Sequence, residues 1–384
     1  MAVVLVDQFP GADASERAKN ALTSRLSGGL LVGPTVLDFR GLDGVQDWTL
    51  DPTSVLSFTD RTAVIWVWGP NTYRMTKAIT IPPNGPYGAA ATGASIRVLP
   101  HHHHVFQGTT FIMQNSSGTR VLATHLFLSY LDNTLATANA TNGSSVVTVT
   151  SANGIEIGTP ISLPGHLPRT GSDTTAVASD PGIGGTSINV ASTAQFPPDN
   201  SNNAATILVG SEIIRYTSKD ATHFLGCTRG AYGTTAASHA VSSLVSRVVA
   251  DTYYVKSVSG TQLTLDHALG VTATALPVYQ GTQDVSFLGS AVFDGNLDAS
   301  NDDPGNPSAV FTMGSRLIRV APNIIIRNWD HGGFFSYGGQ DHAIMADRIT
   351  RSAERISIMA ALLFLSVHTC GYLAVANAVR LMRT

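Results

Sequence analysis

The sequence has few charged residues and few cysteines, and its basic side chains do not outnumber its acidic ones. Only 13% of its 384 residues are charged and the formal net charge is −3, so the composition does not predict nucleic acid as an obligate partner. Two cysteines, Cys227 and Cys370, are too few for a disulfide framework, and no nucleophile motif surrounds either one. Stability must therefore come from burial and backbone pairing.

A recognisable signal peptide is also missing. The N-terminal stretch MAVVLVDQFPG has a short apolar run with no basic segment before it. A protein of this kind that works outside a cell would get there by another route, such as assembly into a particle that lysis releases.

Glycine is abundant, with 36 residues, and Ser, Thr, Asn and Ala fill much of the rest. Glycine supplies the positive φ angles of tight turns, so this composition suits a β-rich protein. Short β-branched or aromatic runs, most of them closed by Gly, Pro or Asn, predict strands at 35–44, 62–69, 77–82, 94–100 and 109–114. No helical pattern lies between them, which argues against a βαβ architecture.

One helix is predicted near the N-terminus, over residues 12–29. Asp13 stands where an N-cap should be, and Glu16 follows three residues later as in a capping box. Apolar residues at helical spacing give the helix one narrow face to bury. Gly28 and Gly29 are expected to end it.

The middle of the chain, residues 133–282, predicts inserted β modules. The stretch GSSVVTVTSANGIEIGTPISL has a strand, a glycine turn and a strand, and TYYVKSVSGTQLTLDHAL continues it as a hairpin. A second unit of similar plan lies between the two, at about 178–248. We therefore expect a small β-barrel-like insertion that carries another β module inside it.

Short strands recur after the insertion. The runs at 284–289, 323–328 and 342–347 can be stacked on one another, and each ends in Gly, Asn or Asp. A recurrence of about 20 residues is typical of a parallel β-helix, in which each coil buries one face and pairs with the next. Residues 1–132 then form the N-terminal cap and first coils, and 283–384 form further coils that stop before the natural end of the domain.

These stretches resemble the right-handed parallel β-helix proteins of the pectate-lyase-like superfamily, especially its phage tailspike-like members. The resemblance rests on the helix with GGLLVGPTVLDFRGLDGVQDW (28–48), on SAVFDGNLDASNDD (290–303) leading into NIIIRNW, and on GGQDHAIMADRIT (338–350). The inserted VGSEIIRYTS and LGCTRGAYGTTAASHA are similar to small β modules of phage tail proteins. The resemblance implies a β-helix, often trimeric, that acts on or binds surface polysaccharides.

The densest acidic stretch is FDGNLDASNDDPGN, residues 293–306. Asp294, Asn296 and Asp298 alternate as in a calcium loop, but an EF-hand would need Gly at position 299 and Glu at position 305. A looser Ca²⁺ site, an Asx-rich loop and a carbohydrate contact therefore remain open. In the stacked register this stretch is additional chain between two strands, which favours the interpretation as an Asx-rich loop.

Catalytic candidates come later, in NWDHGGFFSYGGQDH. Asp330 and Asp341 could act as acid and base in glycoside hydrolysis from neighbouring coils. Polygalacturonase-like enzymes carry Asn-x-Asp, which Asn328-Trp329-Asp330 matches, but their Gly-His-Gly is missing here. The expected substrate contacts are aromatic, imidazole and guanidinium groups of this region: Trp329, His331, Phe335, Tyr337, His342, Arg327 and Arg348. Ordinary packing of a coil turn is the alternative.

Two further features have no assigned role. In the run His101–His104, alternation along a strand would let His101 share a face with His103, or His102 with His104, which allows a weak affinity for transition metals. An exposed turn is the alternative. The uncharged segment 356–379 has the length of a membrane span, but its polar residues favour buried coils or a packed helix.

The sequence therefore predicts an all-β protein, a right-handed parallel β-helix with a short N-terminal capping helix and a nested β insertion. Its expected role is to bind a surface polysaccharide outside the cell or on a virion, and to cleave it if it is a lyase or glycoside hydrolase. The alternative is a non-catalytic structural or adhesin component. Expected partners are a glycan and further copies of the chain, without nucleic acid or membrane, and Ca²⁺ is the one cofactor considered.

Overall fold

The computed structural model divides the chain into two compact units. The stack unit comprises Met1–Pro82, Ala91–Tyr130 and Gly281–Thr384, and the inserted unit contains Leu131–Gln280. The residues that the structure describes are 1–76, 94–115, 117–118, 125–129, 132–168, 174–180, 182–196, 205–296, 308–329, 333–337, 341–345, 348–350, 357–358 and 363–365.

The predicted helix is present as α1 (Ala14–Thr23), and its start is as expected. Asp13 is the N-cap and accepts a hydrogen bond from the Glu16 backbone N–H at 2.9 Å. The predicted end was wrong, because the chain leaves the helix at Ser24 and forms a small hairpin of β2 (Leu26–Ser27) and β3 (Leu30–Leu31). The two glycines expected to end the helix make the hairpin turn instead, with φ of 58° and 82°.

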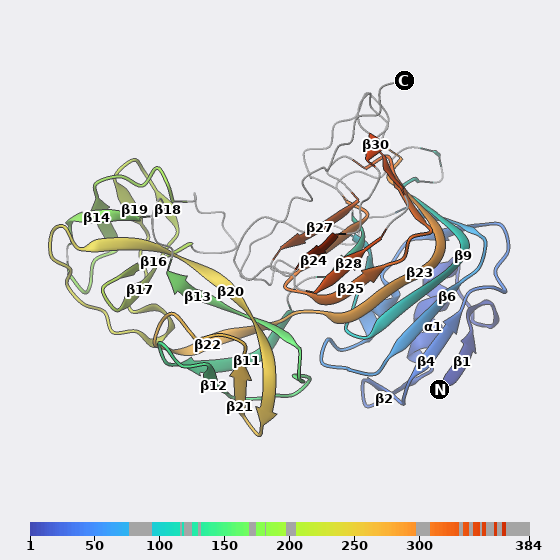
Figure 1. Ribbon diagram of the computed structural model, residues 1–384, viewed down its shortest axis with the longest axis horizontal. Helices are drawn as coiled ribbons and strands as arrows, with labels where there is room; N and C mark the ends of the chain where they lie inside the picture. The colour runs from blue at the N-terminus through green and yellow to red at the C-terminus, as the bar shows by residue number, and fades with distance from the viewer. Residues whose placement is uncertain are drawn as a thin grey trace. The chain divides into compact units, whose positions relative to one another are not determined.

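Most of the described strands of the stack unit pair in parallel (Figure 1). The first ladder pairs each strand in parallel with the next, except for an antiparallel last pair, in the order β1 (Ala2–Leu5), β4 (Thr35–Asp38), β6 (Val64–Trp68), β9 (His102–Ile112), β23 (Gln283–Asp294), β25 (Arg316–Val320), β28 (His342–Ile344) and β31 (Leu363–Leu365). Two short 3-10 helices, η1 (Val6–Gln8) and η2 (Pro52–Val55), both contact α1.

Two further ladders repeat the parallel pairing. The second uses the later halves of β9 and β23, in the order β5 (Val45–Trp48), β7 (Thr72–Met75), β9, β23, β26 (Ile324–Arg327) and β29 (Arg348–Thr350). The third is β8 (Ala94–Arg97), β10 (His125–Ser129), β24 (Val310–Met313) and β27 (Phe334–Tyr337). Successive stretches of chain thus add one strand to each ladder, which is a stacked arrangement.

The stacking register expected after the insertion was wrong. Val285 pairs with Ile318 of β25, a strand that was not predicted from the sequence, and β28 then pairs with β25. The run at 323–328 instead pairs with the far half of β23, where Ala291 lies beside Ile324. Apolar runs of similar length occupy both ladders, so spacing along the chain could not tell which of them are neighbours.

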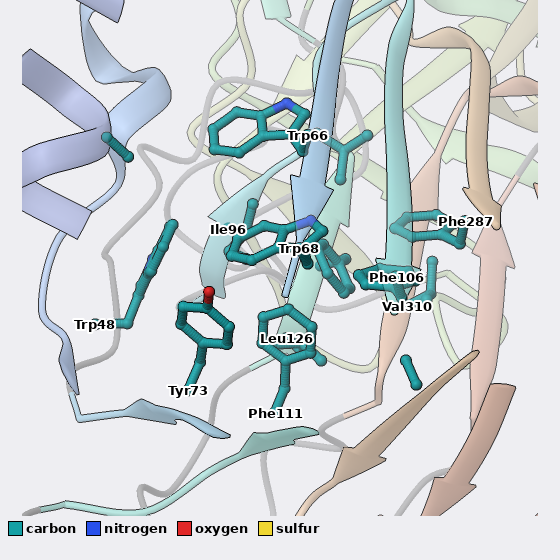
Figure 2. Close-up of a cluster of buried hydrophobic side chains, with 14 of the residues drawn as sticks. Trp48, Trp66, Trp68, Tyr73, Ile96, Phe106, Phe111, Leu126, Phe287 and Val310 are labelled. Carbon is teal, nitrogen blue, oxygen red and sulfur yellow. The ribbon is translucent and has the colours of Figure 1, made fainter. Parts of the chain in front are cut away.

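The interior of the stack unit is filled by aromatic rings (Figure 2). Trp66 and Trp68 point inward from β6 and are fully buried, and the Trp68 ring meets Tyr73 edge-on at 5.0 Å between centroids. Three of the four histidines, His102–His104, belong to β9, and His101 is the half-buried turn residue directly before it. The buried and half-buried histidines alternate as expected. His102 and His104 are buried, and the His104 ring stacks on Phe287 at 5.2 Å.

The inserted unit contains a closed six-stranded antiparallel barrel. Its strands are β11 (Asp132–Ala140), β12 (Val146–Val149), β13 (Pro160–Pro168), β20 (Leu244–Ser259), β21 (Gln262–Leu265) and β22 (Ala273–Gln280), and pairing of β13 with β20 closes the ring. Small and branched apolar side chains such as Ala138, Val147 and Leu276 fill it. A barrel-like insertion is therefore present, as predicted.

A nested module with its own core lies between the barrel strands β13 and β20. It is built from β14 (Thr174–Ser179), β15 (Ser187–Val190), β16 (Ala205–Val209), β17 (Glu212–Tyr216), β18 (Ser218–Lys219), β19 (His223–Leu225), the short η3 (Ala231–Gly233) and the first residues of β20. Its buried side chains include Ile188, Phe224 and Cys227. Burial raises the pKa of the Cys227 thiol to about 11, in keeping with an unreactive cysteine.

Most of the apolar segment 356–379 lies outside the described residues. The parts that are described are two short strands, β30 (Ser357–Ile358) and β31, and both pair antiparallel with the strand beside them. Among the residues that the structure describes, no helix has the length and apolar character needed to span a membrane.

Candidate functional site

A row of polar side chains crosses the second ladder, and we call it the polar row. Strand register places Asp47, Arg74, Ile112, Asp294 and Arg327 side by side on five successive strands. Their neighbours along each strand, such as Tyr73 and Phe293, are buried, so alternation turns the row outward, although Asp294 itself is only 6% exposed. At about 4.8 Å between paired strands, the row is about 19 Å long.

Two aspartate–arginine pairs make up most of the polar row. The Arg74 Nε donates to Asp47 Oδ1 at 2.7 Å, and the Arg327 Nε donates to Asp294 Oδ2 at 2.8 Å. The two guanidinium side chains are 29% and 48% exposed. Within the described part of the chain, the terminal nitrogens of both arginines make no further hydrogen bond, so they are available to a ligand.

The Asp294 carboxylate is held by more than its arginine. Its Oδ1 accepts from the Asn328 side-chain amide at 2.8 Å and from the Asn296 backbone N–H at 2.9 Å. Both asparagines have left-handed backbone angles, with φ of 60° and 54°. Gly295 lies between them, and a Cβ there would be 2.2 Å from the Asn328 carbonyl oxygen, so only glycine lets the two strands approach this closely.

Trp329 lies in the core and not on a sugar-binding surface. The residue is 3% exposed, and its indole N–H donates to the Phe293 carbonyl at 3.0 Å. The expectation that its ring face stacks on a sugar is therefore not met in this structure. The ring instead belongs to the core of the stack unit and is hydrogen-bonded to the backbone one residue before Asp294.

The residues proposed for calcium do not fit a cation in this arrangement. Both Asp294 oxygens already accept hydrogen bonds, one of them from a guanidinium that neutralises the carboxylate. Asn296 contributes its backbone N–H, and Asp298 lies outside the described residues. In the described ranges no group of three or more His, Cys, Asp or Glu side chains could hold a metal ion.

Asp341 and His342 lie at the start of β28, on the first ladder and away from the polar row. Asp341 is exposed and pairs with Arg316, whose Nε donates to Oδ2 at 3.0 Å. Asp341 has a φ of 57°, and similar positive φ angles occur at the same register position on the neighbouring strands, at Leu317, Asp284 and His101. This shared angle marks a corner of the stack at which each chain segment turns into its strand.

The His342 ring is used within the chain. The Ile318 backbone N–H donates to Nδ1 at 3.3 Å, which leaves the proton of the neutral ring on Nε2, facing the Ser315 hydroxyl at 3.3 Å. Burial lowers the pKa of His342 to about 4, although the Asp341 carboxylate acts the other way. The imidazole is therefore neutral near pH 7 and holds β25 against β28.

The remaining predicted residues are placed only in part. Asp330 and His331 lie outside the described residues, so the separation of the Asp330 and Asp341 carboxyl groups is not fixed here. Phe335 and Tyr337 belong to β27, and Arg348 begins β29 opposite Ile325. The structure thus joins Arg327 with Asp294, and it keeps Asp341 and His342 apart from them.

Sequence reasoning missed a buried ionic cluster in the nested module, which we call the clasp. It comprises Asp180, Glu212, Arg229 and His239. Arg229 Nε donates to Glu212 Oε1 and its Nη1 donates to Asp180 Oδ1, both at 2.9 Å, and the two carboxylate side chains are fully buried. Glu212 also accepts from the Gly230 N–H at 2.8 Å and lies 2.7 Å from His239 Nε2.

The clasp holds three loops of the nested module together. Burial alone would raise the pKa of Glu212, but hydrogen bonds from Arg229 and from backbone N–H groups outweigh it and hold the pKa below its usual range. Glu212, Arg229 and His239 all lie in the stretches that resemble phage tail β modules. The occurrence of these charged residues together in those stretches was the sequence signal that could have revealed the clasp.

Comparisons with known proteins gave distant likenesses only. No family model matches the chain, and no curated protein matches it. Among solved structures the chain is similar to the tailspike gp54 of Acinetobacter baumannii bacteriophage AP22, solved in complex with A. baumannii capsular saccharide, with 11% identity over 76% of this chain and 39% of that one and a TM-score of 0.23.

Two other solved structures are similar at the same level. The tailspike gp61 of Pseudomonas phage phi297 has 11% identity over 76% of this chain and 34% of that one, with a TM-score of 0.27. The tailspike gp49 of Pseudomonas phage LKA1 has 10% identity over 86% of this chain and 39% of that one, with a TM-score of 0.20. The chain therefore spans well under half the length of each of these tailspike structures.

Proposed function

We propose that this chain is a polysaccharide-binding protein of the phage tailspike type, displayed on the outside of a virion and built on a right-handed parallel β-helix. The observation that carries the proposal is the polar row, in which two aspartate–arginine pairs stand side by side on stacked parallel strands. Planar carboxylate and guanidinium groups can each bond two neighbouring oxygen atoms, as sugar hydroxyls require. The bound glycan lies along this row.

An extended ligand fits the row better than a compact one. The row runs across the strands, so the two pairs repeat in the stacking direction about 14 Å apart, three strand spacings from one arginine to the other. A linear polymer can touch both pairs at once, and two tethered contacts bind far more tightly than one. A single small sugar would reach only one of them.

Cleavage of the glycan is a second step in this proposal. Asp330 and Asp341 remain its acid and base, and Arg348 stays a substrate contact with His331, Phe335 and Tyr337. The row itself favours binding without cleavage, because Asp47 and Asp294 are both paired with arginine. A non-catalytic adhesin would therefore use the same row.

Replacing Arg327 by alanine should weaken glycan binding about 10-fold or more, because a charge-assisted hydrogen bond to a ligand contributes roughly 1.5–3 kcal/mol. The measurement uses the purified full chain on an array of bacterial capsular and lipopolysaccharide glycans, with chain shortening followed in parallel. Arg40→Ala is the matched control, since Arg40 also pairs with an aspartate, Asp38, but off the row.

Two results would contradict the proposal. One is a glycan whose affinity falls equally in the Arg327→Ala and Arg40→Ala variants, which would place the site elsewhere. The other is a wild-type chain that melts cooperatively and binds nothing on the array. Shortening of a bound glycan that stops with Asp341→Asn would support the catalytic step.

We also propose that the chain works as a homotrimer, through the outward face of the first ladder. Much of that face is apolar: strand register places Val3 beside Val36 and Ile65, and Val105 beside Val67 and Leu288, while Asp38 and His103 lie in the same two rows. Val3 is 64% exposed and Leu288 41%. Exposed apolar surface of this kind marks an interaction site, and copies of one chain close it by symmetry.

The Val67→Asp variant should sediment as a single chain, whereas the wild type sediments with the mass of three. Buried in such an interface, a carboxylate on this face would be left without a partner. Sedimentation equilibrium at several concentrations makes the measurement, and Val146→Asp, at an exposed valine of the inserted unit, is the control. A wild type that sediments as one chain at all concentrations would refute the trimer.

A further inference from the structure

We infer that the polar row recognises uncharged sugar residues, so that the glycan segment held there is a neutral polyol. This inference rests on the proposed function and names the chemistry of its ligand. Arg327 would then contact sugar hydroxyls and not a substrate carboxylate.

The charges of the row cancel. Asp47 and Asp294 each carry one negative charge, Arg74 and Arg327 each carry one positive charge, and every carboxylate is bonded to an arginine on the next strand. Ile112, between the two pairs, is apolar, and Asn296 and Asn328, which adjoin Asp294, are neutral. The row therefore has no net field to attract a polyanion, unlike a strip of unpaired basic residues.

The hydrogen-bonding groups alternate in a way that suits hydroxyls. The Asp47 and Arg74 pair presents guanidinium N–H donors beside a carboxylate that is 34% exposed. The Asp294 oxygens are buried and already bonded, so the second pair presents mainly the Arg327 guanidinium. A sugar hydroxyl both donates and accepts, so it can bridge Asp47 and Arg74. A sugar carboxylate only accepts, and at the same place it would be repelled by Asp47 or Asp294.

The pairing also keeps both arginines in position for this task. Each guanidinium uses its Nε for the aspartate, which leaves the two terminal nitrogens for the ligand and fixes the plane of the group. Asp294 is in turn fixed by the Asn328 amide and the Asn296 N–H. The site is therefore organised before the ligand arrives, which lowers the entropy lost on binding.

The test compares salt dependence and carboxyl reduction on the full chain. Defined capsular polysaccharides, neutral and acidic, are immobilised, and affinities are measured by interferometry between about 50 and about 500 mM NaCl. We expect the tightest binding to a neutral polymer, or to an acidic one that binds as well after its carboxyl groups are reduced to alcohols. In either case the affinity should change less than about twofold with salt.

Other outcomes separate this inference from the function on which it rests. An acidic polymer whose affinity falls about tenfold after carboxyl reduction, or with salt, overturns the inference and leaves polysaccharide binding intact. Binding to no polymer on the panel overturns both.

Changing one charge of the row gives an independent check. Asp47→Asn makes the row net positive and removes a carboxylate acceptor, so a neutral polymer should bind about 3- to 10-fold more weakly. A neutral polymer that binds this variant as tightly as the wild type, or more tightly, would overturn the inference. Asp220→Asn, at an exposed aspartate of the nested module, changes the total charge equally and should leave affinity unchanged.

Discussion

Replacing Arg229 by alanine should lower the free energy of unfolding of the inserted unit by about 3–5 kcal/mol, the usual loss when one partner of a buried ion pair is removed. The arginine is the centre of the clasp, with Glu212 on one side and Asp180 on the other, and both carboxylate side chains are fully buried. Without the guanidinium, two negative charges would share a site that water does not reach. Hydrogen exchange of the β16 and β17 amides measures the change without requiring the whole chain to unfold.

Two comparisons make the Arg229 result specific. Arg215→Ala removes an exposed arginine from the same module and should change stability by less than about 0.5 kcal/mol. The Glu212→Ala, Arg229→Ala double variant should lose clearly less than the sum of the two single variants, because either change alone leaves a charge uncompensated. A loss below about 1 kcal/mol for Arg229→Ala would show that the clasp is not what holds these loops.

Acidification from about pH 7 to about pH 5 should destabilise the stack unit by about 4 kcal/mol through His102 and His104. Burial lowers the pKa of His102 to about 3, with a smaller effect of Arg97, and burial likewise lowers the pKa of His104 well below its usual value. A depressed pKa means that the unfolded chain binds protons that the folded chain does not. The stability is therefore complete above about pH 6.5 and is lost as the pH falls below it.

Chemical denaturation at a series of pH values measures this effect. The slope of stability against pH should correspond to about three protons taken up on unfolding between about pH 6 and about pH 4.5, one each for His102, His104 and His342. His104→Phe keeps a ring in the stack with Phe287 and should remove about one of those protons, while Trp68 loses its acceptor at Nδ1. His223→Gln, at a more exposed histidine of the nested module, is the control. An unchanged slope in the His104→Phe variant would refute the assignment.

Features that depend on near neighbours in the chain were predictable. The Asp13 N-cap was predictable, because its hydrogen-bond partner is the backbone N–H of Glu16, three residues away. The alternation of the four histidines was also predictable, because side chains on a strand alternate. The sequence could not say which pair faces inward. That choice depends on Trp66, Trp68 and Phe287, which stack on His104 from neighbouring strands.

The helix end and the strand register show where local reasoning stops. Pairing of Leu26–Ser27 with Leu30–Leu31 competes with the last turns of the predicted helix and takes precedence. After the insertion, each segment carries apolar runs of similar length on two ladders, and several pairings satisfy the same periodicity. The observed one places Ile318 beside Val285 and Ile324 beside Ala291.

Composition and local pattern were enough for a β-rich chain with a capped N-terminal helix and an inserted barrel-like region, because each of these follows from contacts a few residues apart or from the supply of turn residues. The tertiary structure decided the groups that could do chemistry. Asp47 meets Arg74, Asp294 meets Arg327, and Arg229 meets Asp180 only after distant strands are in register. Burial then determines which of these charges are held inside and which face a ligand, and no linear pattern encodes that.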